Sequence, residues 1–344
     1  KRHKFAQLSG FVNGVIRNIA RNIDSVQFDT LSIQYSMPQW IVDRFVAAYG
    51  EKKAEEIFKA FHSKSTISIR TNLTRCTPDE LRVMLEAEGV TVTAVDELNY
   101  AFVISGFDYL NGLQSFRDGL FYVQDISSML VAQTAAPKKG DYVIDVCAAP
   151  GGKSTHIAEL LQGSGHVLAR DLTDNKVDMI EENIERHGLN NMSAEVWDAT
   201  VFDADSAGKA DILICDLPCS GLGVLGRKKD IRYKMTPESV DELTALQRQI
   251  LDTVHTYVKP NGVLVYSTCT IDEAENEDNV RWFIEKHPEF ELDKSFATAC
   301  GDRKYFGSAS GSRMSASDNE HSLSILRGAE ILCIEQSVFD MIAE

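Results

Sequence analysis

Apolar positions repeat with different periods along the chain, and the changes of period mark its organisation. In residues 11–22 they recur at helical spacing (Val12, Val15, Ile16 and Ile19), which predicts one amphipathic helix. Because a single helix of this length is marginal on its own, we interpret it as the last helix of a larger unit.

A region of mixed pattern follows this helix. Residues 37–63 predict two helices with a break at Gly50. The segments 66–72 and 102–107 have strand character, and a helix is predicted over 77–90 because a Thr-Pro pair opens it. Together these elements predict a small α+β domain.

From about residue 118 the pattern becomes strand, helix, strand. Five apolar runs have the continuous character of parallel strands that are buried on both faces, and they cover residues 141–147, 165–171, 193–198, 210–216 and 262–269. Helices are predicted over 176–187 and 239–258, and we interpret the apolar stripe of the second as core. The predicted fold class is an open, Rossmann-like α/β sheet.

Polar residues stand at the carboxyl ends of these predicted strands. They are Asp145, Asp171, Asp198, Asp216 and Cys269. Ligands of open α/β sheets bind beyond the carboxyl ends of the strands. The shared position therefore predicts one site at this rim.

The loop "DVCAAPGGKST" over 145–155 resembles a phosphate-binding loop but departs from it. Cys147 stands where G-x-x-x-x-G-K-[ST] requires the first glycine, and the Asp145 carboxylate would repel a triphosphate. Asp171 is placed to accept hydrogen bonds from ribose hydroxyls. These residues favour a nucleoside without a polyphosphate, and S-adenosylmethionine fits. A glycine turn with no ligand and a P-loop NTPase are the alternatives.

Two thiols are predicted at the same rim, in "DLPCSG" (Cys219) and "STCT" (Cys269), whereas Cys147 and Cys215 read as small buried apolar residues. Carbon 5 of cytosine is a poor nucleophile until a thiolate adds to carbon 6, and a base must then remove the carbon-5 proton. An amino-directed adenine methyltransferase would carry an aromatic residue at the position of Cys219. The residues alone leave open which thiol attacks.

With these three motifs in this order, the chain resembles the Nol/Nop/Sun-type RNA cytosine-5 methyltransferases, and among them the bacterial small-subunit ribosomal RNA enzymes. The resemblance covers about residues 1–295. It implies that Cys269 is the nucleophile, that Cys219 assists product release, and that Lys153 and Asp216 lie near the target base. It implies an S-adenosylmethionine site formed by Cys147, Ala148, Ala149, Pro150, Gly151, Gly152, Lys153, Asp171, Asp198 and Asp216.

The same resemblance extends to RNA recognition. "RKKDIRYK" over 227–234 matches a basic loop of the family, so Arg227, Lys228, Lys229 and Arg232 are expected to meet the RNA backbone; a solvated charged loop is the alternative. Residues 10–22 resemble the last helix of a NusB-like RNA-binding domain. The chain begins with Lys1 rather than Met, so we expect that most of that domain is missing.

The predicted domains are a helical NusB-like remnant (1–28), the small α+β RNA-binding domain (29–114), the methyltransferase domain (115–298) and an atypical tail (299–344). The family's closing glycine-rich turn and final strand have no counterpart after Glu291, which predicts an exposed sheet edge. The Gly/Ser-rich segment 306–322 is predicted to be mobile, and the last residues, 323–344, read as a short strand or helix.

Composition adds limits to this picture. No apolar run approaches the roughly 18 residues of a membrane helix, and no signal peptide opens the chain. Seven cysteines without paired C-x-x-C spacing indicate free thiols in a reducing cytosol and no metal site. The net charge is −16, yet residues 1–75 carry 12 Lys and Arg against 6 Asp and Glu, a balance of +6 that leaves −22 for the rest. This uneven charge is compatible with a polyanion on one face.

The sequence thus predicts a cytoplasmic, monomeric S-adenosylmethionine-dependent enzyme that methylates carbon 5 of a cytosine in 16S ribosomal RNA. Transfer RNA is the alternative substrate. A noncatalytic RNA-binding assembly factor with the same fold is the alternative of a different class.

Overall fold

The computed structural model describes residues 8–22, 28–63, 66–96, 98–292, 311–316 and 327–328. The chain forms two compact units, Lys1–Lys59 and Ala60–Glu344. The division into four domains expected from the sequence stays a prediction.

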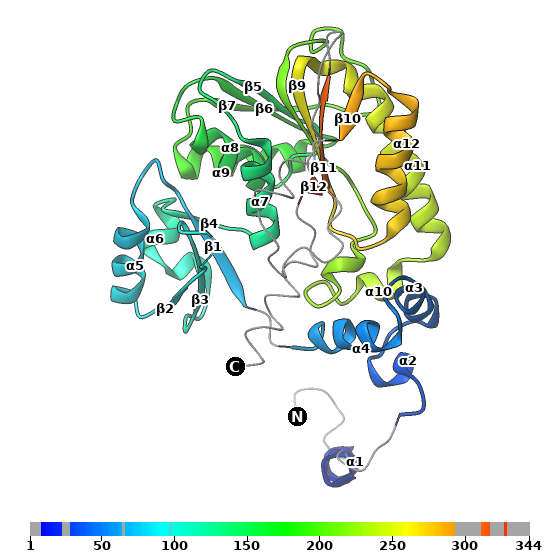
Figure 1. The fold of residues 1–344 in the computed structure, drawn as a ribbon. Coiled ribbons are helices and arrows are strands. Elements are labelled where there is room, and N and C mark those ends of the chain that lie inside the picture. The colour runs from blue at the N-terminus through cyan, green and yellow to red at the C-terminus, as the bar shows by residue number, and fades with distance from the viewer. Residues whose placement is uncertain are drawn as a thin grey trace. The chain divides into compact units, whose positions relative to one another are not determined.

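The first unit is helical. Its elements are α1 (Ser9–Asn22), α2 (Leu31–Gln34), α3 (Gln39–Tyr49) and α4 (Glu51–Ala60) (Figure 1). The expected break between two helices is confirmed at Gly50, whose φ of 79° suits glycine. In α1 the predicted apolar stripe is present but exposed, with Ile16 57% and Ile19 56% accessible. Its origin in a NusB-like domain stays a prediction.

The second unit begins with a four-stranded antiparallel sheet in the order β2-β3-β1-β4. Its elements are β1 (Ile67–Thr71), α5 (Pro78–Ala87), β2 (Thr91–Ala94), β3 (Ala101–Ser105), η3 (Leu110–Gly112), α6 (Gln114–Arg117) and β4 (Phe121–Val123). Helix α5 starts with a capping box between Thr77 and Glu80, as a Thr-Pro opening favours. Strand β4 extends this small sheet beyond the part that the sequence indicated.

The large sheet has eight strands in the order β10-β11-β9-β8-β5-β6-β7, with β12 paired to β11. Its strands are β5 (Tyr142–Asp145), β6 (His166–Asp171), β7 (Met192–Val196), β8 (Ala210–Asp216), β9 (Val258–Ser267), β10 (Phe290–Leu292), β11 (Gly311–Ala316) and β12 (Arg327–Gly328). The connecting helices are α7 (Ile126–Ala135), α8 (Gly152–Leu160), α9 (Asp174–His187), η4 (Leu222–Val224), α10 (Ile231–Lys234), α11 (Pro237–Val254), η5 (His255–Tyr257), η6 (Glu273–Glu275) and α12 (Glu277–Lys286). Strands β9, β8, β5, β6 and β7 are parallel, which confirms the predicted fold class.

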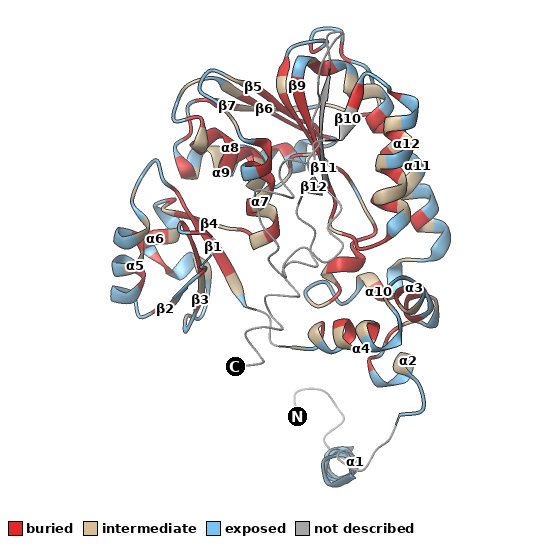
Figure 2. Cartoon of the chain, viewed as in Figure 1, coloured by how far each residue is buried: buried red, intermediate tan, exposed pale blue. Residues whose placement is uncertain are grey.

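Helices cover both faces of this sheet. Alternate residues of each strand face opposite ways, so Val143 packs with α7, α8 and α9 whereas Ile144 packs with α11 and α12. Figure 2 shows the strands between the two helix layers as the most continuously buried part of the chain. This burial on both faces explains why the strands read as unbroken apolar runs.

The sheet edge beside β9 differs from the expectation. Strand β11 pairs antiparallel with β9 and with β10, so the predicted open edge at β9 is wrong. The prediction of a mobile 306–322 is likewise wrong for Gly311–Ala316, because backbone pairing orders a segment whose side chains carry no strand signal. Beyond β12, residues 329–344 lie outside the described part of the chain.

A buried arginine joins the small sheet to the catalytic part of the same unit. Arg70 of β1 is fully buried, donates to Thr155 Oγ1 over 3.1 Å and forms an ion pair with Glu159 of α8. Its Nε atom donates to Gln124 Oε1 over 2.8 Å. Since a buried charge is stable only when paired, these contacts fix the small sheet against the helix that follows the glycine loop.

Candidate active site

The chain order of the parallel strands places a topological switch point between β5 and β8. After β5 the chain adds β6 and β7 on one side of it, and then returns to add β8 and β9 on the other side. The order of strand addition therefore reverses between the neighbours β5 and β8. Such a switch point is where open α/β sheets bind ligands. Asp145 ends β5 and Asp216 ends β8, as the sequence predicted.

The glycine loop folds tightly over the end of β6. The N–H of Ala148 donates to Arg170 O over 2.8 Å, and the N–H of Ala149 donates to Asp171 Oδ2 over 2.9 Å. Gly151, with a φ of 100°, turns the chain into α8, a conformation that L-residues with a side chain rarely adopt. The hydroxyl of Tyr122 donates to Pro150 O over 3.2 Å, which ties the small sheet to the loop.

Asp171 is a centre of hydrogen bonds rather than a free carboxylate. It is 3% exposed, and besides Ala149 it accepts from the N–H of Leu172 and from Lys176 Nζ, each over 2.8 Å. A carboxylate has about four acceptor positions, so one remains, and the half-exposed Lys176 is the partner that is easiest to replace.

Asp145 supports the loop from beneath. It is 1% exposed and accepts hydrogen bonds from Ser154 Oγ and, over 3.4 Å, from the N–H of Cys147. Burial raises the pKa of Asp145 to about 7, against the opposing effect of the Ser154 bond. Burial also raises the pKa of Cys147, with the Asp145 carboxylate adding to it. The Cys147 thiol is therefore a weak nucleophile.

Lys153 and Asp216 form an ion pair across the switch point. Lys153 Nζ lies 2.6 Å from Asp216 Oδ2, and Ser267 Oγ donates to Asp216 Oδ1 over 2.9 Å. Burial lowers the pKa of Lys153, but the Asp216 carboxylate outweighs burial and raises it. Lys153 is therefore a cation held beside Asp216 at the switch point.

The two predicted thiols meet. Cys219 Sγ and Cys269 Sγ are 3.0 Å apart, and the N–H of Cys269 donates to Cys219 Sγ over 3.1 Å. Cys219 follows β8 and Cys269 follows β9, which are adjacent parallel strands, so the topology brings together residues that are distant in sequence.

The surroundings make the two thiols chemically different. The hydrogen bond from Cys219 lowers the pKa of Cys269 against the effects of burial and of the Asp216 carboxylate, and the Lys153 and Lys228 cations lower it further. The same bond raises the pKa of Cys219, as do burial and the Glu275 carboxylate. Cations on one side and an anion on the other favour a Cys269 thiolate that accepts from a Cys219 thiol.

A buried glutamate that the sequence reasoning missed holds the two thiol loops together. Glu275 accepts hydrogen bonds from the N–H of Ser220 over 2.8 Å and from Ser220 Oγ, while Ser220 Oγ lies 2.8 Å from Thr270 Oγ1. Gln247 Nε2 donates to Glu275 Oε1 over 3.0 Å. Ser220 adjoins Cys219 and Thr270 adjoins Cys269, so this network fixes the separation of the sulfurs. One glutamate within the acidic run "DEAENED" over 272–278 gave no sequence signal.

Other expected residues lie further out. Asp198 is exposed, and its Oδ1 accepts from the N–H and hydroxyl of Thr200, over 2.9 Å and 2.7 Å. Lys228 and Lys229 are exposed, and Arg227 forms an ion pair with Asp125.

Arg232 departs from its expected role in RNA contact. It is 3% exposed, and its Nη2 donates to Leu225 O over 3.4 Å. A guanidinium buried in this way supports the loop from inside and presents no donor to an RNA backbone.

Two models of known protein families match the chain. The model of the family described as 16S rRNA methyltransferase RsmB/F matches residues 132–318, more than half of the chain. The chain belongs to the RsmB/F family. A second model, the RsmF/B-like ferredoxin-like domain, matches residues 37–107 ahead of the RsmB/F match.

Curated relatives and a solved structure agree with this assignment. The probable ribosomal RNA small subunit methyltransferase B of Bacillus subtilis is 38% identical over 84% of this chain, and that of Synechocystis is 32% identical over 82%. The chain spans just under two thirds of their lengths, 66% and 65%. The crystal structure of NSun6 from Pyrococcus horikoshii with SFG has a TM-score of 0.68 and 25% identity, over 74% of this chain and 88% of that one.

Proposed function

We propose that this chain is an S-adenosylmethionine-dependent RNA methyltransferase that methylates carbon 5 of a cytosine in small-subunit (16S) ribosomal RNA through a cysteine adduct. The observation that carries the proposal is the sulfur pair, with Cys219 and Cys269 3.0 Å apart beyond the carboxyl ends of β8 and β9. A cytosine-5 reaction requires one thiol to attack carbon 6 and a group that removes the carbon-5 proton, and two adjacent thiols can fill these two roles. Membership of the RsmB/F family supports ribosomal RNA as the substrate.

The residues at the rim fit S-adenosylmethionine. Asp171, Asp198 and Asp216 offer carboxylate oxygens to a ligand with ribose hydroxyls, amino groups and a positive sulfonium, and would repel a polyphosphate. In this proposal the loop from Cys147 to Lys153 holds the ligand, Asp171 the ribose and Asp198 the adenine. When bound, S-adenosylmethionine supplies the methyl group.

Cys269 is the proposed nucleophile. Its thiolate adds to carbon 6 of the cytosine, the new C–S bond takes the sulfur electron pair, and the ring's π pair moves to carbon 5. Lys153, 2.6 Å from Asp216, is the cation placed to stabilise the electron-rich ring, and Asp216 is the acceptor placed for its amino group.

Cys219 acts in the release step. After carbon 5 has taken the methyl group it must lose its proton, and that C–H pair then restores the double bond while the C–S bond breaks and returns its electrons to Cys269. The sulfur of Cys219 lies 3.0 Å from that of Cys269, so we assign Cys219 to this step. After Cys269 has bonded to carbon 6, the Cys219 thiol gives its own proton to solvent, and the resulting thiolate takes the carbon-5 proton. Glu275 positions both thiols through Ser220 and Gln247.

RNA would approach from the side of the basic loop. Lys228 and Lys229 are exposed there, and Lys228 is close enough to lower the pKa of Cys269. A hollow of about 590 Å³ lies between this loop and the small sheet, lined by His62, Ser63, Thr66, Ile67, Ser68, Val123, Asp125, Gly226, Arg227 and Lys229. We propose that this hollow receives the RNA segment next to the target cytosine.

If ribosomal RNA is the substrate, the activity is expected in the cytoplasm.

A denaturing gel tests the proposal. Cys219→Ala is incubated with S-adenosylmethionine and small-subunit ribosomal RNA, and a band shifted by covalently attached RNA is expected because release is blocked after Cys269 has attacked. The Cys219→Ala/Cys269→Ala double variant should give no such band. Cys76→Ala, which removes a half-buried thiol of the small domain, should behave as wild type.

The other results discriminate between the alternatives. A band with transfer RNA alone would keep the chemistry and change the substrate. A band that persists in the double variant would refute Cys269 as nucleophile. No band with either RNA, while S-adenosylmethionine still binds, would favour the noncatalytic assembly factor.

A further inference from the structure

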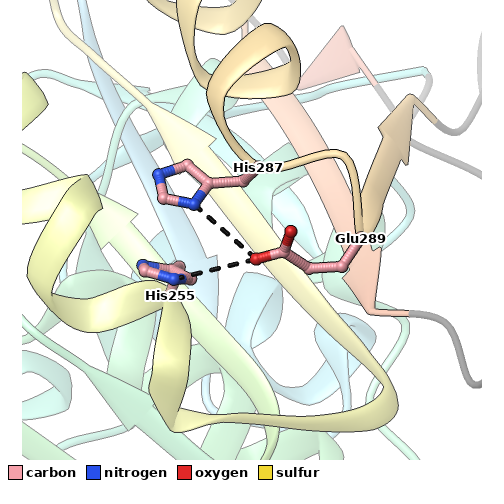
Figure 3. Close-up of side chains that lie close together, drawn as sticks. All are labelled: His255, His287 and Glu289. Carbon is pink, nitrogen blue, oxygen red and sulfur yellow. Dashed lines mark ion pairs between the residues drawn. The ribbon is translucent and has the colours of Figure 1, made fainter.

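A cluster of two histidines and a glutamate lies apart from the thiol site, on the face of the large sheet that α11 and α12 cover. His255 opens η5 directly after α11, His287 follows α12, and Glu289 precedes β10. The ligand atoms of the three side chains lie within 4.8 Å of one another. Figure 3 shows both imidazole rings directed at the same carboxylate oxygen.

We propose that His255, His287 and Glu289 form a binding site for a transition-metal ion, with Zn²⁺ as the preferred ion and water as the fourth ligand. Two imidazoles and a carboxylate are ligands that suit Zn²⁺, whereas Mg²⁺ and Ca²⁺ prefer sites made of oxygen alone.

The distances favour a shared ion over direct contact. Glu289 Oε1 lies 3.8 Å from His255 Nε2 and 3.6 Å from His287 Nδ1, both too long for a hydrogen bond. A tetrahedral Zn²⁺ with bonds of about 2.0–2.2 Å would hold its ligand atoms roughly 3.4 Å apart. The cluster is therefore close to the ligand spacing of a zinc site.

The second nitrogen of each ring has an oxygen beside it. His255 Nδ1 is hydrogen-bonded to Leu251 O over 3.3 Å, whereas His287 Nε2 lies 3.2 Å from Asp252 Oδ1 as an ion-pair contact without hydrogen-bond geometry. A proton on each of these nitrogens leaves the lone pair on the atom that faces Glu289. Histidine ligands of metals are usually oriented in this way, by a carbonyl or a carboxylate.

The rings are also suited to be neutral ligands. Their centroids are 4.0 Å apart, so two protonated rings would repel each other. Burial lowers the pKa of His287, and the proximity of His255 lowers it further. Metal binding requires unprotonated imidazole, and the lowered pKa of His287 favours that form of its ring.

The location indicates a structural role. Exposed fractions of 16%, 8% and 46% for the side chains of His255, His287 and Glu289 leave an entry path for the ion past the glutamate. An ion held by all three would connect the end of α11 to the turn that leads into β10. It would therefore stabilise the helix layer beside the edge of the sheet.

Calorimetry with Zn²⁺ on the full chain, without an affinity tag and after removal of metals, tests the site. We expect one equivalent to bind with a micromolar or lower dissociation constant and to raise the thermal midpoint. Glu289→Gln should weaken binding at least tenfold, as should His287→Asn. Glu285→Gln changes an exposed glutamate of α12 outside the cluster and should bind as wild type.

The thiol pair is the competing zinc ligand, so Co²⁺ absorption on the same chain separates the two sites. The proposal expects a tetrahedral Co²⁺ spectrum without thiolate charge-transfer bands, and the same spectrum in the Cys219→Ala/Cys269→Ala variant. Absence of binding, or binding that survives Glu289→Gln and disappears with the thiols, would overturn it. Both readouts are independent of methyl transfer.

Discussion

At the scale of single residues, Asp171 combines two tasks. Its carboxylate accepts hydrogen bonds from the N–H of Ala149 in the glycine loop and from Lys176 Nζ at the surface. In the proposed function the same carboxylate also accepts hydrogen bonds from the ribose hydroxyls of S-adenosylmethionine. Both tasks are compatible if the ribose hydroxyls use the remaining acceptor position or take the place of Lys176. The competition between lysine and ligand can be measured.

We expect Asp171→Asn to raise the S-adenosylmethionine dissociation constant roughly tenfold or more, the effect of one lost charge-assisted hydrogen bond. Lys176→Met removes the competing cation and keeps the length of the side chain, so the constant should stay unchanged or fall. Equilibrium dialysis of both variants checks the pair. An unchanged constant in Asp171→Asn would remove the ribose from our assignment.

The sequence located the residues of this site far better than it located their supports. Asp145, Asp216, Cys219 and Cys269 could be found because strand ends in a parallel sheet converge, whatever the intervening loops do. Glu275 could not be found, because its importance comes from burial beside Ser220, and burial of a polar residue is a property of the fold. Arg232 was misjudged for the same reason, since its charge is visible in the sequence and its burial is not.

At the scale of elements, the strands of the large sheet were predictable where their cores are apolar on both faces. Strand β2, whose residues are mostly exposed, and the three-residue β4 have too few buried positions to give a period. Helix α7 (ISSMLVAQTA) has polar and apolar residues in an order without helical period, so it has no amphipathic stripe. Strand β11 is ordered by its neighbours rather than by its own side chains.

The contact between the small sheet and α9 depends on one glycine. Gly119 has a φ of 66°, and a Cβ atom there would lie 1.9 Å from the backbone oxygen of Arg186. Asn72 Nδ2 joins the same two regions by donating to Gly119 O over 2.9 Å and to His187 O over 3.2 Å. No side chain fits at Gly119 unless the backbone segments separate.

Gly119→Ala should therefore destabilise the chain more than its backbone conformation alone explains. Gly208→Ala is the matched control, because Gly208 has a φ of 62° and no atom lies within 4 Å of the point where its Cβ would stand. Each substitution costs about 1 kcal/mol for the left-handed conformation. Gly119→Ala should lose roughly 2 kcal/mol more through overpacking, measured as free energy of unfolding in urea. Equal losses would show that the two segments can separate at no cost.

At the scale of the whole molecule, the proposed function requires a chain of net charge −16 to bind a polyanion, which it can do only through a local surface. The exposed cations of the basic loop lie on the carboxyl-end side of the sheet, where Lys228 affects Cys269. Another adjacent pair, Lys138 and Lys139, is exposed just before β5 begins, at the opposite end of the parallel strands. The two lysine pairs therefore differ in position but not in charge.

None of the helices in the described segments is both long and apolar enough to span a membrane.

Lys228→Gln/Lys229→Gln should weaken RNA binding several-fold and lower the slope of log affinity against log salt by about 1.4, or roughly 0.7 for each charge lost on a single strand. Lys138→Gln/Lys139→Gln makes the same change in net charge and should leave the slope as in wild type. Filter binding at a series of salt concentrations gives both values. Equal slopes for the two double variants would mean that net charge, not the basic loop, governs binding.

The strand order has a consequence for synthesis of the chain. The glycine loop leaves the ribosome first, but Lys153 finds Asp216 only 63 residues later, and Cys219 waits another 50 residues for Cys269. Domains complete their folding as the last contributing segment emerges. A nascent chain can therefore shape its cofactor loop well before it holds both sulfurs, and under the proposed function it stays inert towards the RNA of the particle that is making it. The emergence of Cys269 therefore determines when during synthesis the thiol site is complete.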